Sequence, residues 1–233
     1  MRYLGLALYA EGPTDYYFLK PLLRRVCESL CACQGVVPLE IGDILELDDP
    51  VESRDERRAE RIATTASASR DAWHILFLHA DGSGNPDRVR EEQVAPAMRC
   101  LEAELGVEYG SVAVIPVRET EAWLLADGDS LRRAFGINRS DQELGIPSLA
   151  RDVEGIPDPK QVLEAACVMT ASRRRGRRKK ASAFFELIGE LVSIDTLRQI
   201  PAFKAMHDEL SETLQRLGFI SVMLILAFGV TST

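Results

Sequence analysis

The sequence predicts an α/β fold: a mostly parallel sheet flanked by helices, followed by a mainly helical C-terminal part. Three observations lead to this prediction. Short apolar runs alternate with helix-like segments as far as about residue 128, which is the order of strand–helix–strand units with helices on both faces of a sheet. Beyond that residue, helical patches are separated by Gly, Pro and charged connections. The 233 residues, 46% of them hydrophobic, suit one domain with a sizeable core and a smaller appendage.

Apolar spacing and turn residues place the elements of the first part. A helix is expected after the first strand, because Thr14 can cap it and apolar residues follow at helical spacing. Pro21 lies inside this helix, so a kink or a late start is expected. In order, the predicted elements are a strand over 3–10, a helix from Thr14 to Leu30, a strand over 36–47, a salt-laced helix from Arg54 towards Ser69, a strand over 73–80, a helix over about 86–105 and a strand over 112–117.

Helical spacing continues in the second part, and the chain divides into three regions. We expect a core over residues 1–128, a mainly helical part over 129–218 that packs on it, and an apolar tail over 219–233. The tail is too short for an ordinary membrane span, which needs about 20 residues. It could be a last core element, a partner-binding segment or a poorly ordered end. The expected helices of the second part cover 130–135, 159–169, 181–192 and 202–217.

The charge of the chain argues against strong, indiscriminate binding to nucleic acid. The formal net charge is −8, which favours a soluble protein. One segment is the exception, because it holds seven positive charges and could track a phosphate backbone. A solvated loop that balances an acidic body explains this segment about as well. The seven residues are Arg173, Arg174, Arg175, Arg177, Arg178, Lys179 and Lys180.

The first residues and the cysteines favour a cytoplasmic location. Met1 and Arg2 lead directly into a strand-like run, so no secretory signal peptide is expected. The five cysteines are an odd number, and a reducing cytoplasm suits them best. No second Cys or His pair at zinc spacing follows the cluster of Cys27, Cys31 and Cys33.

The most informative feature is a pair of acids placed where two strands should end. Glu11 follows the first apolar run, and Asp81 follows the run over 73–80. Functional groups of open α/β sheets gather beyond the carboxyl ends of the strands, so neighbouring strands would bring both carboxylates to one edge. Two bare carboxylates about 4 Å apart repel by about 4 kcal/mol at an effective dielectric of about 20. A divalent cation removes that penalty, so the pair predicts a Mg²⁺ site.

Further acids and a glycine-rich turn could join this edge. Glu119 and Glu121 end a third apolar strand, and the convergence of three strand ends is more specific than any single acid. The turn over 82–84 could let a phosphate approach, although it matches no P-loop. Simpler interpretations stay open: Glu11 could cap the following helix or point to solvent, and Asp81 could be a helix cap. Glu119 could pair with Arg118 or with a basic residue elsewhere.

Two histidines and one lysine give weaker signals. His79 has the strand parity of Asp81, but a packed strand histidine is the simpler interpretation. His207 is expected to be solvated on a late helix. Lys160 follows Asp158-Pro159, where it could reach a phosphate or belong to a helix start with proline in its first turn.

Several motifs resemble a known family. Glu11-Gly12-Pro13-Thr14-Asp15 resembles the first motif of TOPRIM domains, the Rossmann-like fold shared by topoisomerases, bacterial primases and OLD-type nucleases. His79-Ala80-Asp81-Gly82-Ser83 stands where those domains carry Asp-x-Asp. The string Glu119-Thr120-Glu121-Ala122-Trp123-Leu124-Leu125-Ala126-Asp127, with Asp158-Pro159-Lys160, is similar to the TOPRIM-like bacterial proteins called domain of unknown function 4276. The resemblance covers most of residues 1 to about 218.

The resemblance implies a TOPRIM-like fold and roles for single residues. Glu11 would be the general acid or base, and Asp81 would bind Mg²⁺ or Mn²⁺. Ser83 replaces the second aspartate of Asp-x-Asp, although its hydroxyl or a water could still coordinate. Glu119 or Glu121 could supply the missing charge. The departure argues against a two-metal mechanism and leaves a one-metal or an inactive site open. Candidate accessory residues are Asp15, Asp127 and Lys160.

Three functional hypotheses follow. The first is a Mg²⁺-dependent nuclease or other phosphoryl-transfer enzyme acting on nucleic acid, which the basic run would position. The second is a non-catalytic binding or regulatory subunit with a degenerate TOPRIM site, favoured by Ser83, the net acidity and the apolar tail. The third is a protein that holds a small nucleotide at 82–84. The resemblance also implies phage defence and an ABC-like ATPase partner. The sequence does not distinguish DNA from RNA and predicts no oligomeric state.

Overall fold

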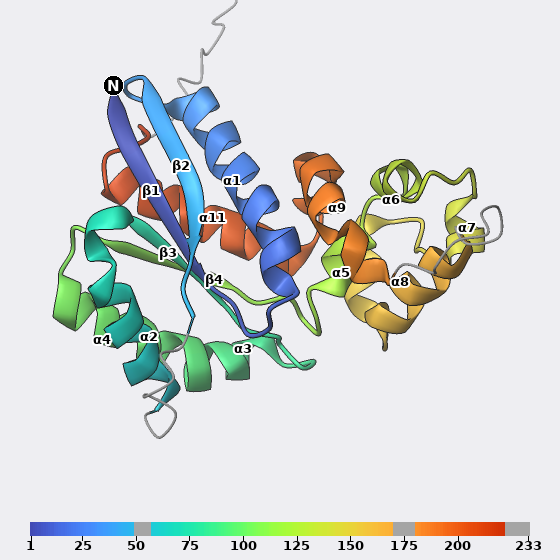
Figure 1. The fold of residues 1–233 in the computed structure, drawn as a ribbon, viewed down its shortest axis with the longest axis horizontal. Coiled ribbons are helices and arrows are strands. Elements are labelled where there is room, and N and C mark those ends of the chain that lie inside the picture. The colour runs from blue at the N-terminus through green and yellow to red at the C-terminus, as the bar shows by residue number, and fades with distance from the viewer. Residues whose placement is uncertain (49–56, 170–179, 222–233) are drawn as a thin grey trace, which may run out of the picture.

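A four-stranded parallel sheet forms the centre of the protein (Figure 1). The computed structural model describes residues 1–48, 57–169 and 180–221. The strand order is β2-β1-β3-β4, so the first strand of the chain is central and pairs with two neighbours. The strands are β1 (Arg2–Tyr9), β2 (Leu39–Glu46), β3 (Ile75–His79) and β4 (Gly110–Val114).

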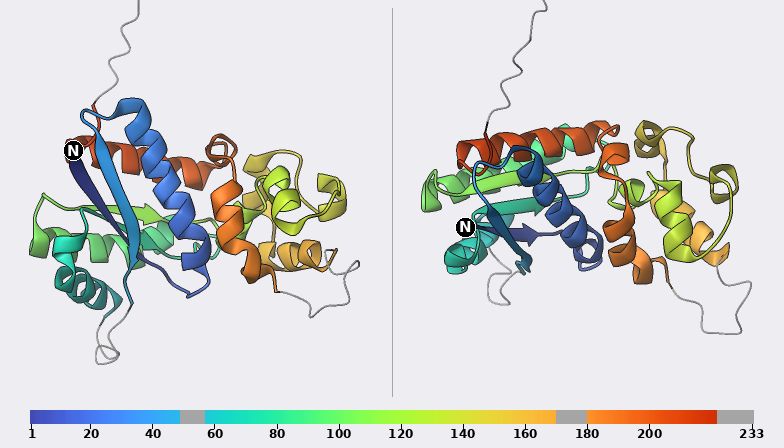
Figure 2. Two further views of the ribbon diagram at one scale, coloured as in Figure 1. Left: turned by 45° about the horizontal axis from the view of Figure 1, so that its top comes forward. Right: turned by 90° about the horizontal axis from the view of Figure 1, so that it is seen from above.

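Two pairs of helices cover the two faces of the sheet, and Figures 1 and 2 show them on opposite sides. They are α1 (Asp15–Gln34) with α11 (Pro201–Arg216), and α2 (Arg58–Ala68) with α4 (Ala95–Leu105). Leu6 and Leu8 of β1 face the first pair, whereas Ala7 and Tyr9 face the second, because successive strand residues point to opposite sides. The α/β fold class predicted from the sequence is therefore confirmed.

The strand order creates a switch point between β1 and β3 at the carboxyl edge of the sheet. The chain leaves β1 towards β2 on one side and leaves β3 towards β4 on the other. Loops that diverge in this way mark the place where open α/β sheets bind ligands. Glu11 and Asp81 follow the two strands that border the switch point. The connection after β3 runs through α3 (Pro86–Val89), a π-helical turn (Arg90–Val94) and α4.

Short helices form a lobe beyond the carboxyl edge of the sheet (Figures 1 and 2), and we call residues 121–200 the helical lobe. Its elements are α5 (Glu121–Leu124), α6 (Gly128–Phe135), α7 (Asp141–Leu144), the 3-10 helix η4 (Ala150–Gly155), α8 (Pro159–Val168), the 3-10 helix η6 (Ala181–Phe184), α9 (Phe185–Leu191) and α10 (Ile194–Leu197). α9 packs on α1, and α11 then returns along β4. Every regular element described after β4 is helical.

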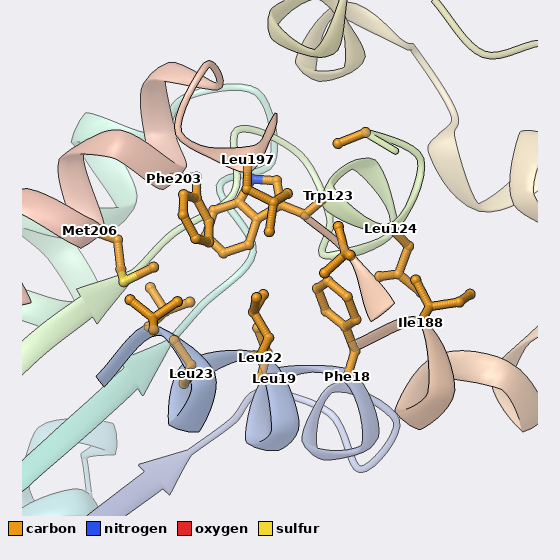
Figure 3. Close-up of a cluster of buried hydrophobic side chains, with 14 of the residues drawn as sticks. Phe18, Leu19, Leu22, Leu23, Trp123, Leu124, Ile188, Leu197, Phe203 and Met206 are labelled. Carbon is orange, nitrogen blue, oxygen red and sulfur yellow. The ribbon is translucent and has the colours of Figure 1, made fainter. Parts of the chain in front are cut away.

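Trp123 anchors the helical lobe to the sheet (Figure 3). Its side chain is fully buried where α1, α11 and the lobe meet. Its ring centre lies 5.2 Å from that of Phe203 on α11, in an edge-to-face arrangement. Phe18 and Leu22 of α1 and Leu197 of α10 belong to the same cluster. One apolar core thus extends from the sheet into the lobe and fixes the lobe over the strand ends.

Glu154 of η4 is a buried carboxyl in this core. Nε1 of Trp123 donates to its Oε1 at 3.4 Å, and the backbone at Val117 and Ala202 also donates to the carboxylate. Burial nevertheless raises the pKa of Glu154 above its ordinary value. The folded protein therefore binds this proton more tightly than the unfolded chain does. As the pH rises from the unfolded pKa of about 4.3 to the higher folded pKa, ionisation of Glu154 lowers the free energy of unfolding.

We expect Glu154→Gln, which cannot ionise, to raise Tm relative to wild type more at pH 7 than at pH 4. The reason is that the buried charge is present only at the higher pH. Thermal unfolding of both proteins at the two pH values measures the difference. A Tm difference that stays constant between pH 4 and pH 7 would contradict the expectation.

The last helix corrects one expectation. The prediction that His207 is solvated is wrong, because its side chain is only 9% exposed. It lies four residues after Phe203 in the stripe that α11 turns towards the core.

The first helix also differs from one expectation. α1 begins at Asp15 and runs through Pro21 without a break, so its start is not late.

The described start of the apolar tail belongs to the core. Phe219 and Ile220 are buried, and Ile220 forms a β-bridge with Gly35. Residues 222–233 of the predicted tail lie outside the described residues. Within the described ranges, none of the helices has the length and apolar character needed to cross a membrane.

Candidate active site

The side chain of Glu11 reaches from the end of β1 to the end of β3. Its Oε2 accepts a hydrogen bond from the backbone N–H of Asp81 at 2.9 Å. The two acids therefore lie side by side at the switch point of the sheet. Neither acid is the N-cap of the following helix, because Thr14 and Asn85 hold those positions.

The loop after β3 is docked on the segment after β4. The backbone N–H of Gly82 donates to the carbonyl oxygen of Pro116 at 2.9 Å. A larger residue would not fit here, since a Cβ added to Gly82 would lie 2.3 Å from that oxygen. Ser83 has a φ of 49°, the only positive φ of a non-glycine residue in the described chain. This tight docking holds Asp81 close to the acids that follow β4.

A buried histidine joins three loops beneath the acids. His79 is fully buried at the end of β3. The backbone N–H of Glu11 donates to its Nδ1 at 3.3 Å, and its Nε2 lies 2.9 Å from Oγ1 of Thr120. The hydroxyl of Thr120 in turn hydrogen-bonds the carboxylate of Asp15. His79 and Thr120 thus connect the loops that follow β1, β3 and β4.

These contacts also assign the direction of the hydrogen bonds. Because Nδ1 of His79 accepts from Glu11, the proton of the neutral ring lies on Nε2. Nε2–H then donates to Thr120, which leaves the hydroxyl proton of Thr120 for Asp15. The series of donors therefore starts at the backbone of the β1 loop and ends on a carboxylate.

Asp15, Glu119 and Glu121 bring further carboxyls to this edge. Burial raises the pKa of Asp15. Burial, followed by the charge of Asp81, raises the pKa of Glu119. Burial, followed by the charge of Glu119, raises the pKa of Glu121. We call Glu11, Asp15, Asp81, Glu119 and Glu121 the acid cluster. The charges of Asp15, Asp81, Glu119 and Glu121 oppose one another, so a cation would favour the ionised forms of Asp15, Glu119 and Glu121.

Two carboxylate oxygens of the acid cluster have no hydrogen-bond partner among the described residues. They are Oδ1 of Asp81 and Oε2 of Glu119, and both atoms are buried. Nε2 of His79 lies 3.5 Å from the Asp81 oxygen, but its hydrogen bond goes to Thr120. Unpartnered buried anionic oxygens are costly, and oxygen ligands are those that Mg²⁺ and Mn²⁺ prefer, so these residues fit such an ion. In the part of the chain that the structure describes, no three His, Cys, Asp or Glu side chains already form a metal site.

Asp127 does not join the acid cluster. Its Oδ1 accepts from the backbone N–H of Asp129 at 3.0 Å, and its Oδ2 accepts from that of Ser193 at 3.0 Å. The side chain therefore caps α6 and fastens the segment before α10. Its role in the described structure is to hold the helical lobe together.

The predicted basic residues are only partly described. Lys160, at the start of α8, and Lys180, before η6, are exposed. The rest of the basic run, residues 173–179, lies outside the described residues. Glu119 forms no ion pair with Arg118 within the described ranges, but the positive charge of Lys160 acts on Glu119 and partly offsets the rise of its pKa.

Thr120 is the site residue that the sequence analysis missed. Its hydroxyl is fully buried between two acids that were named. Nothing in its own sequence context indicates the contact with His79, which lies 41 residues earlier. The available signal was the parity of His79 with Asp81, because residues two apart on a strand point to the same side.

The comparison with known families covers most of the chain. The family model described as "Domain of unknown function (DUF4276)" matches residues 10–211. The chain belongs to this family. The matched range contains every member of the acid cluster, and the DUF4276 membership predicted from the sequence motifs is confirmed.

Two other comparisons do not extend this family assignment. No curated protein matches this DUF4276 chain. Among solved structures, it is similar to the C-terminal region of the Burkholderia pseudomallei OLD protein, with 13% sequence identity and a TM-score of 0.38. That match covers 89% of this chain and 97% of the other.

Proposed function

We propose that this DUF4276 protein is a Mg²⁺- or Mn²⁺-dependent, TOPRIM-like nuclease or phosphoryl-transfer enzyme that acts on nucleic acid. The supporting observation is the meeting of acids from three strand ends. Glu11 contacts Asp81, and a buried, unpartnered oxygen of Glu119 belongs to the same cluster. Such a set of oxygens suits a divalent cation, and cations of this kind serve phosphoryl transfer.

Asp81 and Glu119 are the proposed metal ligands, because their buried oxygens have no other partner in the described chain. Glu121 and Asp15 add negative charge beside them. When bound, the ion would polarise a phosphodiester and stabilise charge on its oxygens. The hydrogen bonds from His79 and Thr120 hold the strand-end loops in register, so the ligands keep their places while substrate binds.

Glu11 is the proposed proton carrier. Its Oε2 is oriented by the backbone N–H of Asp81, and its own backbone N–H is held by His79. The residue is exposed, so a water or hydroxyl can reach Oε1. A carboxylate that is both oriented and accessible can take a proton from the attacking group and return it to the leaving group.

The alternative function is a non-catalytic binding or regulatory subunit with a degenerate site. Ser83, in place of the second aspartate of Asp-x-Asp, favours this alternative. The lack of a ready three-ligand group in the described residues favours it too. An ABC-like ATPase as partner, a role in phage defence and the positioning of nucleic acid by the basic run remain predictions from the sequence.

Incubation of the purified chain with DNA and RNA oligonucleotides tests the proposal. We expect cleavage when Mg²⁺ or Mn²⁺ is added, none in EDTA, and recovery when excess metal is restored, because the ion supplies the charge stabilisation. Calorimetric titration with Mn²⁺ should show saturable binding. Absence of both cleavage and metal binding, together with a stable partner protein, would contradict the enzyme and support the subunit.

A further inference from the structure

Two lysines without ion pairs converge on one pocket. The structure describes four lysines: Lys20, Lys160, Lys180 and Lys204. Lys20 and Lys204 each form an ion pair with a nearby carboxylate. Lys160 and Lys180 form none with any described residue, and both line a pocket of about 360 Å³. The charge of Lys160 also acts on Glu119 and Glu121 of the acid cluster. Cations that gather at a cavity are a common way to bind an anionic ligand.

The pocket lies between the start of α1 and the helical lobe, and we call it the lobe pocket. Besides the lysines, it is lined by the hydroxyl residues Thr14 and Ser182 and by the apolar residues Leu163 and Phe185. Thr14 stands at the N-cap of α1 but makes no capping hydrogen bond with its side chain. The pocket therefore offers cations and free hydroxyls to one ligand, whereas Leu163 and Phe185 are only 1% and 4% exposed and form its floor.

The lobe pocket adjoins the acid cluster. Glu121 lines the pocket and also interacts electrostatically with Glu119 and Asp15. Glu164 is the other acid of the pocket, and its Oε1 accepts from the backbone N–H of Ala181 at 3.4 Å. A ligand in the pocket would thus lie next to the acid cluster, with the side chain of Glu121 between them.

We infer that the lobe pocket binds one nucleotide of a nucleic-acid strand, with its phosphate at Lys160 and Lys180. Lysine is an ordinary partner of phosphate. The volume lies in the range of small-ligand sites, about 300–1,000 Å³. The inference rests on the proposed function and deepens it. It places one nucleotide of the substrate strand next to the phosphate on which the acid cluster would act.

Titration with thymidine 5′-monophosphate in EDTA tests the lobe pocket without any cleavage. Calorimetry on the whole chain should show saturable binding. Lys160→Ala and Lys180→Ala should each weaken binding by about tenfold or more, because each removes a charge-assisted contact. Lys204→Ala is the matched control, since that lysine is paired on α11 and lies outside the pocket. Its affinity should equal that of wild type.

The phosphate contact is tested separately. Thymidine, which has no phosphate, should bind about tenfold or more weakly than the nucleotide, because it lacks the charge-assisted contacts. Thymidine that binds as tightly as the nucleotide would overturn the phosphate contact. Unchanged affinity in both pocket variants would overturn the site as a whole.

Asp81→Asn separates this inference from the proposed function. The variant should still bind thymidine monophosphate, because Asp81 does not line the lobe pocket. Wild-type protein that cleaves with Mg²⁺ but does not bind the nucleotide would overturn the pocket and leave the activity standing. Nucleotide binding that depends on both lysines, without any metal-dependent cleavage, would keep the pocket and contradict the activity.

Discussion

Replacing Glu11 by Gln, or Asp81 by Asn, is expected to slow metal-dependent cleavage by about 10²-fold or more. Each change keeps the shape of the side chain and removes its negative charge. Glu11→Gln still has an oxygen to accept the backbone hydrogen bond from Asp81, so the two loops should stay together. Asp81→Asn removes the charge of a carboxylate whose buried Oδ1 has no hydrogen-bond partner within the described ranges.

The two variants should differ in metal binding. Calorimetry with Mn²⁺ should show clear loss for Asp81→Asn, because Asp81 is a proposed ligand, and a smaller change for Glu11→Gln, because Glu11 is the proposed proton carrier. Single-turnover cleavage of a labelled oligonucleotide gives the rates. Glu104→Gln is the control, since Glu104 is exposed on α4, which covers one face of the sheet and carries no member of the acid cluster. Wild-type rates in both site variants would remove the site assignment.

Trp123→Ala is expected to lower the free energy of unfolding by about 3–5 kcal/mol, the usual cost of truncating a buried aromatic residue. The change empties the place where α1, α11 and the helical lobe meet (Figure 3). It also removes the edge-to-face contact with Phe203 and the N–H that donates to Glu154. For a chain of this length, each kcal/mol corresponds to about 2–4 °C in Tm.

Urea unfolding followed by circular dichroism measures this loss. Trp123→Phe should lose less, because it keeps an aromatic ring in the core and gives up mainly the hydrogen bond to Glu154. Val107→Ala is the surface control, since Val107 is 71% exposed, and it should change stability by about 0.5 kcal/mol at most. A urea midpoint for Trp123→Ala equal to that of wild type would show that the lobe does not depend on this anchor.

The meeting of Glu11 and Asp81 could be predicted from the sequence because parallel strands end at a common edge. Apolar runs identify the strands, and an acid follows each run directly. If the two strands are neighbours in the sheet, the two acids lie close together. Adjacency itself does not follow from the apolar runs. It holds because β1 lies between β2 and β3, an order that hydrophobic spacing alone does not encode.

Other parts of the site depend on packing that no local pattern reveals. The hydrogen bond of Thr120 to His79 requires the segment after β4 to dock on the loop after β3, which Gly82 permits by its lack of a Cβ. The lobe pocket joins Thr14 to Lys180, residues that are brought together only when the helical lobe packs on α1. Asp127 has the same acidic side chain as its neighbours in the motif, yet the structure uses it as a helix cap.

The return of α11 to the sheet has a consequence for how the protein is made. In chain order the helical lobe is an insertion, since the chain leaves the sheet after β4 and comes back only at Pro201. A nascent polypeptide that has already emerged with all its strands still lacks the helix that shelters Val112 and Val114 from water. The ribosome must therefore release the lobe before the sheet can complete its core.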